Sequence, residues 1–400
     1  MLTLENALER ILDRLPVLPV EPVALVNADG RVLRAEPIAR TDLPAFDNSA
    51  MDGYAVRAGD TAGAAKDQPK WLKLTGQIAA GEAPTCSVES GAAVRIFTGS
   101  MMPPGADAVV MQEDTLTLPE RPGEIAIIDG VKPWENVRFR GEDVKQGRVV
   151  VPVGTRLSAP QLAVLAASGI AQVDVSRAPV VGLLATGSEL IEAGHPLQPG
   201  QIYESNRLML ASLLGRWGAR TVIYPIVTDT LEATRAALQK AFTECDVVVT
   251  SGGVSVGGFD FVKEAFTSLG GQLDFWRVAI KPGKPFVFGE WDGRFLFGLP
   301  GNPVSAFVTA AVLMRPALMR MQGMTDVSLP MVNAIMAEPI TNRGDRRHFL
   351  RVILDATGSV KLAGTQASHQ LHSLAAANAL LDVPPETVLA AGASVKVSLI

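Results

Sequence analysis

The stretch that most constrains the fold of this chain runs from residue 250 to 260 and reads Thr-Ser-Gly-Gly-Val-Ser-Val-Gly-Gly-Phe-Asp. It follows the apolar run 246–249 and precedes a helical pattern that begins near Asp260, so a buried strand passes through four glycines into a helix. Glycine lets the backbone approach a ligand with its N–H groups pointing inward, and the helix N-terminus adds partial positive charge. The stretch predicts an anion-binding turn, although a tight structural turn would use the same residues.

Two further strand ends carry polar turns that contain glycine. The turn 298–305 follows the strand-like segment 294–297, with Asn302 as a suitable N-cap and Pro303 at the first helical position. The third turn, Ala185-Thr186-Gly187-Ser188, follows an apolar segment that begins at residue 180. Three such turns in one segment predict an open parallel sheet whose ligand crevice lies at the carboxyl ends of the strands.

Strands and helices alternate from about residue 177 to 323, which predicts a doubly wound α/β domain. The expected elements are a strand at 180–185, a helix at 206–217, a strand at 221–227, a helix at 231–242 and a strand at 246–250.

The remainder of the chain predicts additional domains, because 400 residues with 48% hydrophobic composition exceed what one core usually holds. Short apolar segments separated by Gly and Pro predict a small β domain, and the last 70 or so residues are again β-like. The amphipathic segment carrying Leu4, Leu8 and Ile11 and the helical segment 158–169 flank the first β domain, so we expect them to pack together as a stem. The expected division is a stem of residues 1–45 and 144–177, an inserted β domain of residues 46–143, an α/β domain of residues 178–326 and a C-terminal β barrel of residues 327–400.

Composition argues against several classes of protein. A net charge of −5 disfavours general nucleic-acid binding, which normally needs a basic face. Cys86 and Cys245 form neither a metal-binding spacing nor a disulfide framework, which suits a reducing cytoplasm. The apolar run 306–314 is shorter than the roughly 20 residues that cross a bilayer, so we expect no membrane residence.

Familiar nucleotide motifs are missing, but a hydrolase motif is present. No Gly-x-Gly-x-x-Gly occurs, and Gly283-Lys284 lacks the earlier glycine of a P-loop. Residues 253–257 do match Gly-x-Ser-x-Gly, the nucleophile elbow of α/β hydrolases. A serine hydrolase that uses Ser255 is therefore an alternative on local sequence.

Charged residues cluster near the predicted crevice. Lys281 and Lys284 stand three residues apart on a segment stiffened by Pro282 and Pro285, and two such ammonium groups repel unless an anion lies between them. A solvated turn with exposed lysines is the alternative. Three acids follow strand ends or the glycine stretch, and acids that converge on phosphates need a hard cation such as Mg²⁺. These acids are Glu189, Asp229 and Asp260, each of which could instead be a helix N-terminal acid.

The two β domains also contain polar turns. Residues 46–55 pack two acids, an amide and a hydroxyl into a glycine-bearing turn, and residues 95–99 and 138–143 place polar groups beside glycine, which loop packing would equally explain. Near the C-terminus, strand alternation would place Arg347 and Arg351 on one side, where a guanidinium suits an oxyanion.

Taken together, these motifs resemble the molybdopterin molybdenumtransferase family of the MoeA type, which includes the E domain of gephyrin. The resemblance rests on residues 47–55, 140–143, 251–257, 280–285 and 299–305. It implies an elongated, dimeric subunit of four parts with a molybdopterin-adenylyltransferase-like α/β domain. The family inserts molybdate into adenylyl-molybdopterin with Mg²⁺, cleaves the phosphoanhydride and releases AMP. A non-enzymatic dimeric scaffold remains an alternative, suggested by the likeness to gephyrin.

The resemblance also implies roles for individual residues. The molybdate pocket would consist of Lys281, Lys284, Pro285, Ser305, Arg351 and Ser368. The pterin and nucleotide would be bound by Ser251, Gly252, Gly253, Ser255, Pro300, Pro303, Thr98 and Glu189, with Mg²⁺ near Glu189, Asp229 and Asp260. Catalytic roles would fall to Asp52, Asp143, Asp229, Asp260 and Lys281.

The implied active site lies at a subunit interface. Asp52, Thr98 and Asp143 would come from the inserted β domain, which in this family faces the α/β domain of the other subunit. The implied partners are small-molecule substrates, a second copy of the chain and the molybdopterin adenylyltransferase. The chain departs from many members of the family at Ser188, where Asp is common, and at Phe261, where Tyr is common.

Overall fold

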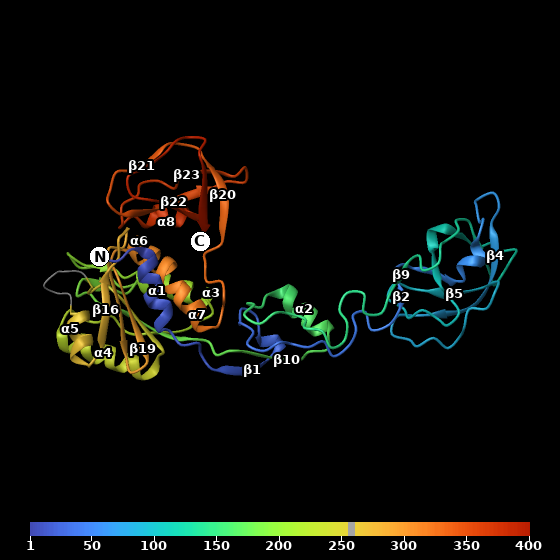
Figure 1. Cartoon of the computed structure of the whole chain (residues 1–400), viewed down its shortest axis with the longest axis horizontal. Helices are drawn as coiled ribbons and strands as arrows, with labels where there is room; N and C mark the ends of the chain where they lie inside the picture. Colours follow the sequence, from blue (N-terminus) through green and yellow to red (C-terminus); the bar gives the residue numbers. More distant parts are fainter. Residues whose placement is uncertain (255–260) are drawn as a thin grey trace.

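The computed structural model describes residues 1–254 and 261–400, which form an elongated molecule (Figure 1). The α/β domain and the C-terminal barrel lie together at one end, the stem lies in the middle, and the inserted β domain lies at the far end. The expectations for Ser255 and Asp260 fall outside the described residues.

The α/β domain is built on a six-stranded sheet with the order β14-β11-β15-β19-β18-β16. The first four strands are parallel, and the last two run antiparallel to their neighbours. The strands are β11 (Val180–Ala185), β14 (Arg220–Ile223), β15 (Val247–Ser251), β16 (Gln272–Arg277), β18 (Pro285–Trp291) and β19 (Arg294–Leu299). Because the chain leaves β11 first for β14 on one side and then for β15 on the other, the switch point lies between β11 and β15. The doubly wound fold is confirmed.

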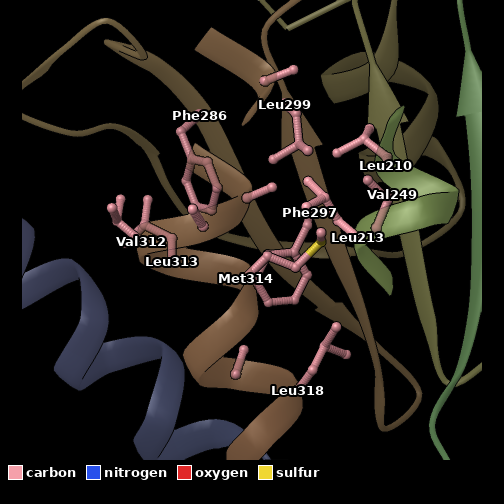
Figure 2. Close-up of a cluster of buried hydrophobic side chains, with 14 of the residues drawn as sticks. Leu210, Leu213, Val249, Phe286, Phe297, Leu299, Val312, Leu313, Met314 and Leu318 are labelled. Atoms are coloured by element: carbon pink, nitrogen blue, oxygen red, sulfur yellow. The ribbon is translucent and has the colours of Figure 1, made fainter. Parts of the chain in front are cut away.

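Helices cover both faces of this sheet. The helices of the domain are α1 (Leu4–Arg14), α3 (Asn206–Arg216), α4 (Leu231–Glu244), α5 (Val262–Ser268), α6 (Pro303–Thr309) and α7 (Arg315–Met321), with a π-helical turn at Ala310–Met314. On one face, α3 and the α6–α7 helix pack on aromatic and aliphatic side chains of the strands, including Phe286 and Phe297 (Figure 2). On the other face, α4 and α5 bury Phe242 and Phe266. This core holds the strand ends in place around the site.

The N-terminal helix α1 belongs to this core rather than to the stem. Thr3 caps it by accepting a hydrogen bond from the Asn6 backbone N–H at 3.2 Å. Ala7 and Ile11 are fully buried, and α1 packs against α7 (Figure 1). The expectation that α1 packs against the helix of residues 158–169 is therefore wrong. An apolar stripe specifies that a helix is buried but not against which partner.

The predicted apolar run 306–314 is part of a longer helix that spans Pro303–Met321. Its length of 19 residues and mean hydropathy of 1.3 would suffice to cross a membrane, so the sequence-based length argument is wrong. However, 83% of its most apolar window is buried inside the protein, as in a core helix.

The strand expected at 221–227 is shorter than predicted, because β14 ends at Ile223. Pro225 has no backbone N–H to donate to a sheet, so pairing stops before it. Only Val227 pairs again, as an isolated bridge to Thr186. This bridge brings the segment that carries Asp229 beside the end of β11.

The stem and the inserted domain are mainly β. The stem pairs β1 (Val20–Ala24) with β10 (Gln172–Ser176) and includes α2 (Ala159–Ala167) and the 3₁₀ turn η1 (Leu25–Asn27). The inserted domain contains a sheet with the order β6-β3-β5-β4-β8-β7 and a small β2–β9 pair. Its elements are β2 (Asn48–Ser49), β3 (Gly53–Val56), η2 (Ala58–Thr61), β4 (Lys70–Ile78), β5 (Ala92–Ile96), β6 (Ala108–Met111), η3 (Gln112–Asp114), β7 (Thr115–Leu116), β8 (Glu124–Ile127) and β9 (Val137–Arg138).

The C-terminal domain is a closed barrel, as predicted. Its strands are hydrogen-bonded side by side in the order β22-β23-β20-β26-β24. The barrel closes because β24 also pairs with β22. Its elements are β20 (Met331–Met336), β21 (Ile340–Asn342), β22 (Arg347–Leu354), β23 (Ser359–Leu362), α8 (Leu371–Ala376), β24 (Ala379–Val383), β25 (Thr387–Leu389) and β26 (Ser394–Leu399). The short strand β17 (Ile280–Lys281) from the α/β domain pairs in parallel with β22, which places Lys281 opposite His348. The barrel is thereby joined to the loop that carries Lys281 and Lys284, which we call the lysine loop.

Candidate active site

A cavity of about 770 Å³ opens at the carboxyl ends of β11, β15 and β19. Its walls include the turn after β11, the turn after β15 and the start of α6. This is the crevice that a doubly wound sheet offers to a ligand, and its volume suits a small organic molecule.

Many of the sequence-predicted residues line this cavity, and others do not. Those that line it are Glu189, Asp229, Ser251, Gly252, Gly253, Pro285, Pro300, Pro303 and Ser305. Those in the described part of the chain that do not line it are Lys281, Lys284, Arg351, Ser368, Asp52, Thr98 and Asp143.

The glycines after β15 are required by the backbone and by packing. Gly252 and Gly253 have φ angles of 91° and 68°, a region that favours glycine. A Cβ on Gly252 would lie 2.8 Å from the Thr186 carbonyl oxygen. The turn therefore lies directly against the end of β11, and the two strand ends form one continuous wall.

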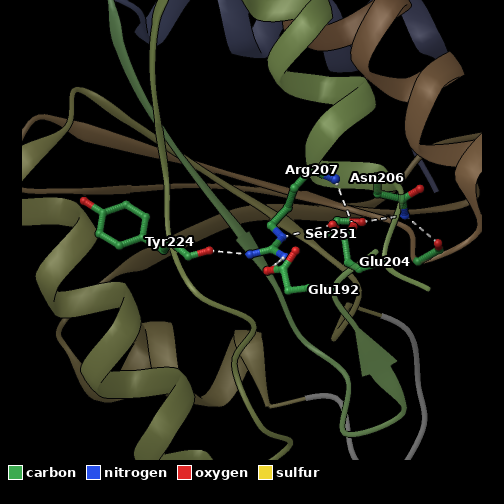
Figure 3. A network of polar contacts seen from close by, with 7 residues as sticks. Glu192, Glu204, Asn206, Arg207, Tyr224 and Ser251 are labelled. Carbon is green, nitrogen blue, oxygen red and sulfur yellow. Dashed lines mark hydrogen bonds and ion pairs between the residues drawn. The ribbon is translucent and has the colours of Figure 1, made fainter. Parts of the chain in front are cut away.

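Asn206, the first residue of α3, joins two of these turns. Its Nδ2 donates to Ser251 Oγ and to the Gly301 carbonyl oxygen, both at 2.7 Å (Figure 3). The neighbouring Arg207 is 4% exposed, and its Nε donates to Glu204, which lines the cavity, at 3.0 Å. Arg207 also forms an ion pair with Glu192. Both glutamates belong to the segment of residues 188–204, which is thus held against α3.

Two predicted carboxylates lie together in the cavity wall. Asp229 Oδ2 accepts a hydrogen bond from the Ser188 backbone N–H at 2.8 Å, and the Asp229 N–H donates to Ser188 Oγ at 3.2 Å. Glu189 follows directly in the chain. Mg²⁺ commonly uses one or two carboxylates together with waters and substrate phosphates, so this pair fits such an ion. Among the described residues, however, no group of three His, Cys, Asp or Glu side chains could hold a metal.

A group of cations and hydroxyls lies beside the cavity, and we call it the cationic corner: Lys281, Lys284, Ser305, Arg351 and Ser368. The lysine loop lies against α6, since a Cβ on Gly283 would lie 2.5 Å from Thr309 Cγ2. Thr309 Oγ1 in turn donates to the Ser305 carbonyl oxygen at 2.8 Å. At the start of α6, Asn302 Nδ2 donates to Ser368 Oγ at 3.0 Å, so the barrel contributes to the same corner.

Arg351 is the most unusual member of this corner, because its guanidinium is fully buried. Nη2 donates to the Thr365 carbonyl oxygen at 2.8 Å, whereas Nε and Nη1 have no hydrogen-bond partner within residues 1–254 and 261–400. No salt bridge to Arg351 is found in the same residues, and burial alone lowers the pKa of its guanidinium. A buried cation without a counter-ion is costly, and a bound anion would offset that cost.

His348 stands next to Lys281 in the same corner. Burial, and after it the positive charges of Lys281, Arg351 and Arg346, together lower its pKa from 6.5 to about 4. The imidazole is therefore neutral at physiological pH and adds no charge to the corner.

The residues predicted from the inserted domain lie far from the cavity of their own chain (Figure 1). Asp52 accepts hydrogen bonds from the Thr98 backbone N–H at 2.7 Å and from Thr98 Oγ1 at 2.8 Å. These bonds hold the pKa of the Asp52 carboxyl below its usual value. Asp143 is exposed, and its N–H donates to the Leu43 carbonyl oxygen. A single chain does not bring these residues to the other candidates.

Several cavity residues were missed by the sequence analysis. Thr186, Tyr203, Glu204, Asn206 and His369 all line the cavity. Asn206 is the first residue of α3 and follows the cap residue Ser205, so the polar pair at this helix start is a signal that could have identified it. His369 comes from the barrel, and no periodicity in the sequence places it beside the α/β domain.

The fold and the site define a class of protein: a multidomain α/β protein whose sheet crevice is lined by glycine-bearing turns and adjoins a buried cation. Three family models match the chain in succession. The MoeA N-terminal region (domains I and II) matches residues 2–169, a probable molybdopterin binding domain matches residues 182–320, and the MoeA C-terminal region (domain IV) matches residues 333–400. The chain therefore belongs to the MoeA family of molybdopterin molybdenumtransferases, and it is an enzyme of the transferase class.

Curated relatives and solved structures agree with this assignment. Molybdopterin molybdenumtransferase 2 of Mycobacterium tuberculosis H37Rv is 41% identical over 382 residues, which cover 94% of each chain. The molybdopterin molybdenumtransferase of Haemophilus influenzae is 39% identical and covers 96% of this chain and 95% of its own. The crystal structure of the molybdopterin biosynthesis MoeA protein from Pyrococcus horikoshii OT3 covers 100% of both chains, with a TM-score of 0.84 and 33% identity. Neither the hydrolase nor the scaffold alternative gains support from these comparisons.

Proposed function

We propose that this protein inserts molybdenum from molybdate into adenylyl-molybdopterin, cleaving the phosphoanhydride and releasing AMP. The names of its relatives supply the reaction class. The observation that carries the proposal is the buried guanidinium of Arg351, which has two unpartnered nitrogens among the described residues. A dianion such as molybdate would supply the missing charge and acceptors.

The cationic corner suits a tetrahedral oxyanion. Lys281 and Lys284 are exposed and can approach an anion from outside, while Arg351 faces it from the protein interior. Ser305 and Ser368 add hydroxyl donors beside the start of α6. The soft dithiolene sulfurs of the pterin are good ligands for molybdenum, so the protein needs mainly to hold the oxyanion next to them.

The neighbouring cavity suits the organic part of the substrate. The Gly252 N–H donates to the Leu299 carbonyl oxygen, so the Gly253 N–H is the group of the glycine turn after β15 that can donate to a phosphate oxygen. Glu189 and Asp229 can hold Mg²⁺ beside it. When bound, Mg²⁺ would neutralise charge on the phosphates. Ser305 belongs to the cationic corner and also lines the cavity together with Ser251, so phosphate and molybdate would be close neighbours.

We further propose that the complete site forms between two copies of the chain. Asp52, Thr98 and Asp143 lie at the opposite end of the molecule from the cavity, so only a second copy can bring them to it (Figure 1). A homodimer arranged antiparallel would place each inserted domain against the α/β domain of its partner.

We also propose a cytoplasmic location and transfer of the substrate from a molybdopterin adenylyltransferase. Both cysteines are free thiols, as a reducing compartment would keep them. Adenylyl-molybdopterin carries a reactive dithiolene, and direct contact with the enzyme that makes it would limit its loss.

The proposal is tested by measuring AMP release from adenylyl-molybdopterin in the presence of Mg²⁺, with and without molybdate. We expect molybdate to accelerate AMP release in the wild-type protein. Lys281→Ala should raise the molybdate concentration needed for half-maximal release about tenfold, as loss of one charge-assisted contact does. Lys396→Ala is the matched control, because Lys396 is an exposed lysine of β26 away from the corner. A rate of AMP release that is the same with and without molybdate would contradict the proposal.

A further inference from the structure

Two buried polar atoms in the cavity wall have no partner within the described part of the chain. They are Thr186 Oγ1 and Asn206 Oδ1. Their residues are only 8% and 7% exposed, and both line the cavity. Buried polar groups in proteins are normally hydrogen-bonded, so a missing partner at a cavity wall indicates a ligand group.

The orientation of the Asn206 amide follows from its neighbours. The Gly301 carbonyl oxygen lies 2.7 Å from one amide atom of Asn206 and can only accept, so that atom must be Nδ2. The remaining atom is Oδ1, which can only accept a hydrogen bond. The wall therefore presents an acceptor at Asn206.

Ser251 presents a donor on the same wall. Its Oγ accepts from Asn206 Nδ2 at 2.7 Å, and within residues 1–254 and 261–400 its hydroxyl hydrogen has no acceptor. Thr186 Oγ1 can donate or accept. Figure 3 shows the Asn206 and Ser251 side chains next to each other. The Thr186 backbone N–H donates to the Ser251 carbonyl oxygen at 3.2 Å, so an acceptor, a donor and a second hydroxyl come from the ends of β11 and β15 and the start of α3 in one cavity wall.

We propose that Thr186, Asn206 and Ser251 form a subsite that recognises the hydrogen-bonding edge of a nitrogen heterocycle in the substrate. Asn206 Oδ1 would accept from an amino or ring N–H group, and Ser251 would donate to an adjacent ring nitrogen or carbonyl oxygen. This inference rests on the proposed function, because adenylyl-molybdopterin carries two rings with such an edge, the pterin and the adenine. The remaining cavity volume accommodates either ring.

A pair of matched substitutions separates recognition from packing. Thr186 and Thr250 both have buried, unpartnered hydroxyls among the described residues, but only Thr186 lines the cavity. Valine has the shape of threonine without the hydroxyl. Without ligand, Thr186→Val and Thr250→Val should both keep or raise the urea midpoint of unfolding, because each removes an unsatisfied polar group. Thr186→Ser, which keeps the hydroxyl, should bind ligand like the wild type.

Ligand binding is then measured by calorimetry with AMP plus Mg²⁺ and, separately, with free pterin. Thr186→Val should weaken the binding of one of these probes about tenfold, and Thr250→Val should weaken neither. Loss of AMP binding assigns the subsite to adenine, and loss of pterin binding assigns it to the pterin. If the wild type binds neither probe, the KM for adenylyl-molybdopterin in the AMP-release assay decides, with the same tenfold expectation for Thr186→Val.

The inference is overturned if Thr186→Val binds both probes like the wild type and keeps the wild-type KM. It is also overturned if Thr186→Val and Thr250→Val weaken binding equally, or if Thr186→Val lowers the urea midpoint, since the hydroxyl would then serve the fold. Failure of the proposed function shows differently, as an absence of molybdate-dependent AMP release in the wild type.

Discussion

At the scale of single residues, Arg351 and Arg347 differ although they lie on one side of the same strand. Arg347 is paired with Asp382 and Glu5, so its charge is compensated. Arg351 is more deeply buried and has no acidic partner in the described residues. A buried charge that folding does not compensate is retained at a cost in stability, which binding of an anion can offset.

This contrast predicts opposite effects of the same substitution. Arg351→Met should raise the free energy of unfolding by about 1 kcal/mol or more without ligand, because it removes an uncompensated buried cation. Arg347→Met should lower it, since Asp382 loses its partner. Arg351→Met should also abolish the response of AMP release to molybdate. Urea unfolding and the AMP-release assay check both effects, and a destabilised Arg351→Met with a normal response to molybdate would contradict them.

His348 predicts how stability depends on pH. Its pKa is about 4 in the folded protein and 6.5 in an unfolded chain, so between these values the unfolded state binds the proton more strongly. Stability should therefore fall as the pH is lowered from 6.5 toward 4. His348→Gln removes this contribution, which at pH 5 amounts to at most about 2 kcal/mol. Urea unfolding at pH 7 and pH 5 measures it, and equal losses in wild type and variant would disprove the assignment.

At the scale of elements, the glycine turn and the helices make different demands on glycine. Gly252 has a φ of 91°, and a Cβ there would lie 2.8 Å from the Thr186 carbonyl oxygen. Gly252→Ala should therefore lower the free energy of unfolding by about 2 kcal/mol or more and weaken AMP binding. Gly215 lies within α3 with open space around it, so Gly215→Ala should raise stability by about 0.5–1 kcal/mol. Thermal unfolding distinguishes the two, and similar effects of both variants would refute the argument.

The sequence predicted the elements whose signals are local. The strand at 180–185 and the start of α6 at Asn302-Pro303 lie where apolar runs and capping residues indicated. The strand predicted at 221–227 ends earlier, at Ile223, because the apolar pattern continues past Pro225 but the proline cannot donate to a sheet. The partner of α1 could not be predicted, since its apolar stripe fits any apolar surface and only the tertiary fold selects α7.

The candidate site was predicted where residues follow strand ends in one domain. Ser251, Gly252 and Asp229 line the cavity because parallel strands end at the same edge of the sheet. Asn206 and His369 were not predicted, because neither follows a strand of the sheet. Asn206 is held at the cavity by its hydrogen bond to the Gly301 carbonyl oxygen, and His369 reaches the cavity because the barrel packs beside it. For Arg351, alternation gave the correct side of β22, but only the structure shows that the side chain is fully buried.

At the scale of the whole molecule, the elongated shape separates two sets of candidate residues. Asp52 and Thr98 lie in the inserted domain, and the cavity and Lys281 lie at the other end (Figure 1). If each active site combines the α/β domain of one subunit with the inserted domain of the other, Asp52→Ala and Lys281→Ala should complement each other. A heterodimer of the two contains one site with both residues intact.

The assay uses a molybdate concentration well below the wild-type half-maximal value, where the tenfold higher requirement of Lys281→Ala leaves about a tenth of the wild-type rate. Each variant alone should then show little activity, whereas co-expressed variants should recover about a quarter of the wild-type activity, because random pairing gives half heterodimers with one intact site of two. Lys281→Ala mixed with Asp229→Ala is the matched control. Both of these substitutions affect the α/β domain, so every site in their heterodimer carries one defect and no activity should return. Recovery is measured as molybdate-dependent AMP release, first in the co-expressed mixture and then in heterodimers isolated by tandem purification with two tags, which should reach about half of the wild-type activity because one of their two sites is intact. Isolated Asp52→Ala/Lys281→Ala heterodimers without activity would mean that the inserted domain does not complete the site of its partner.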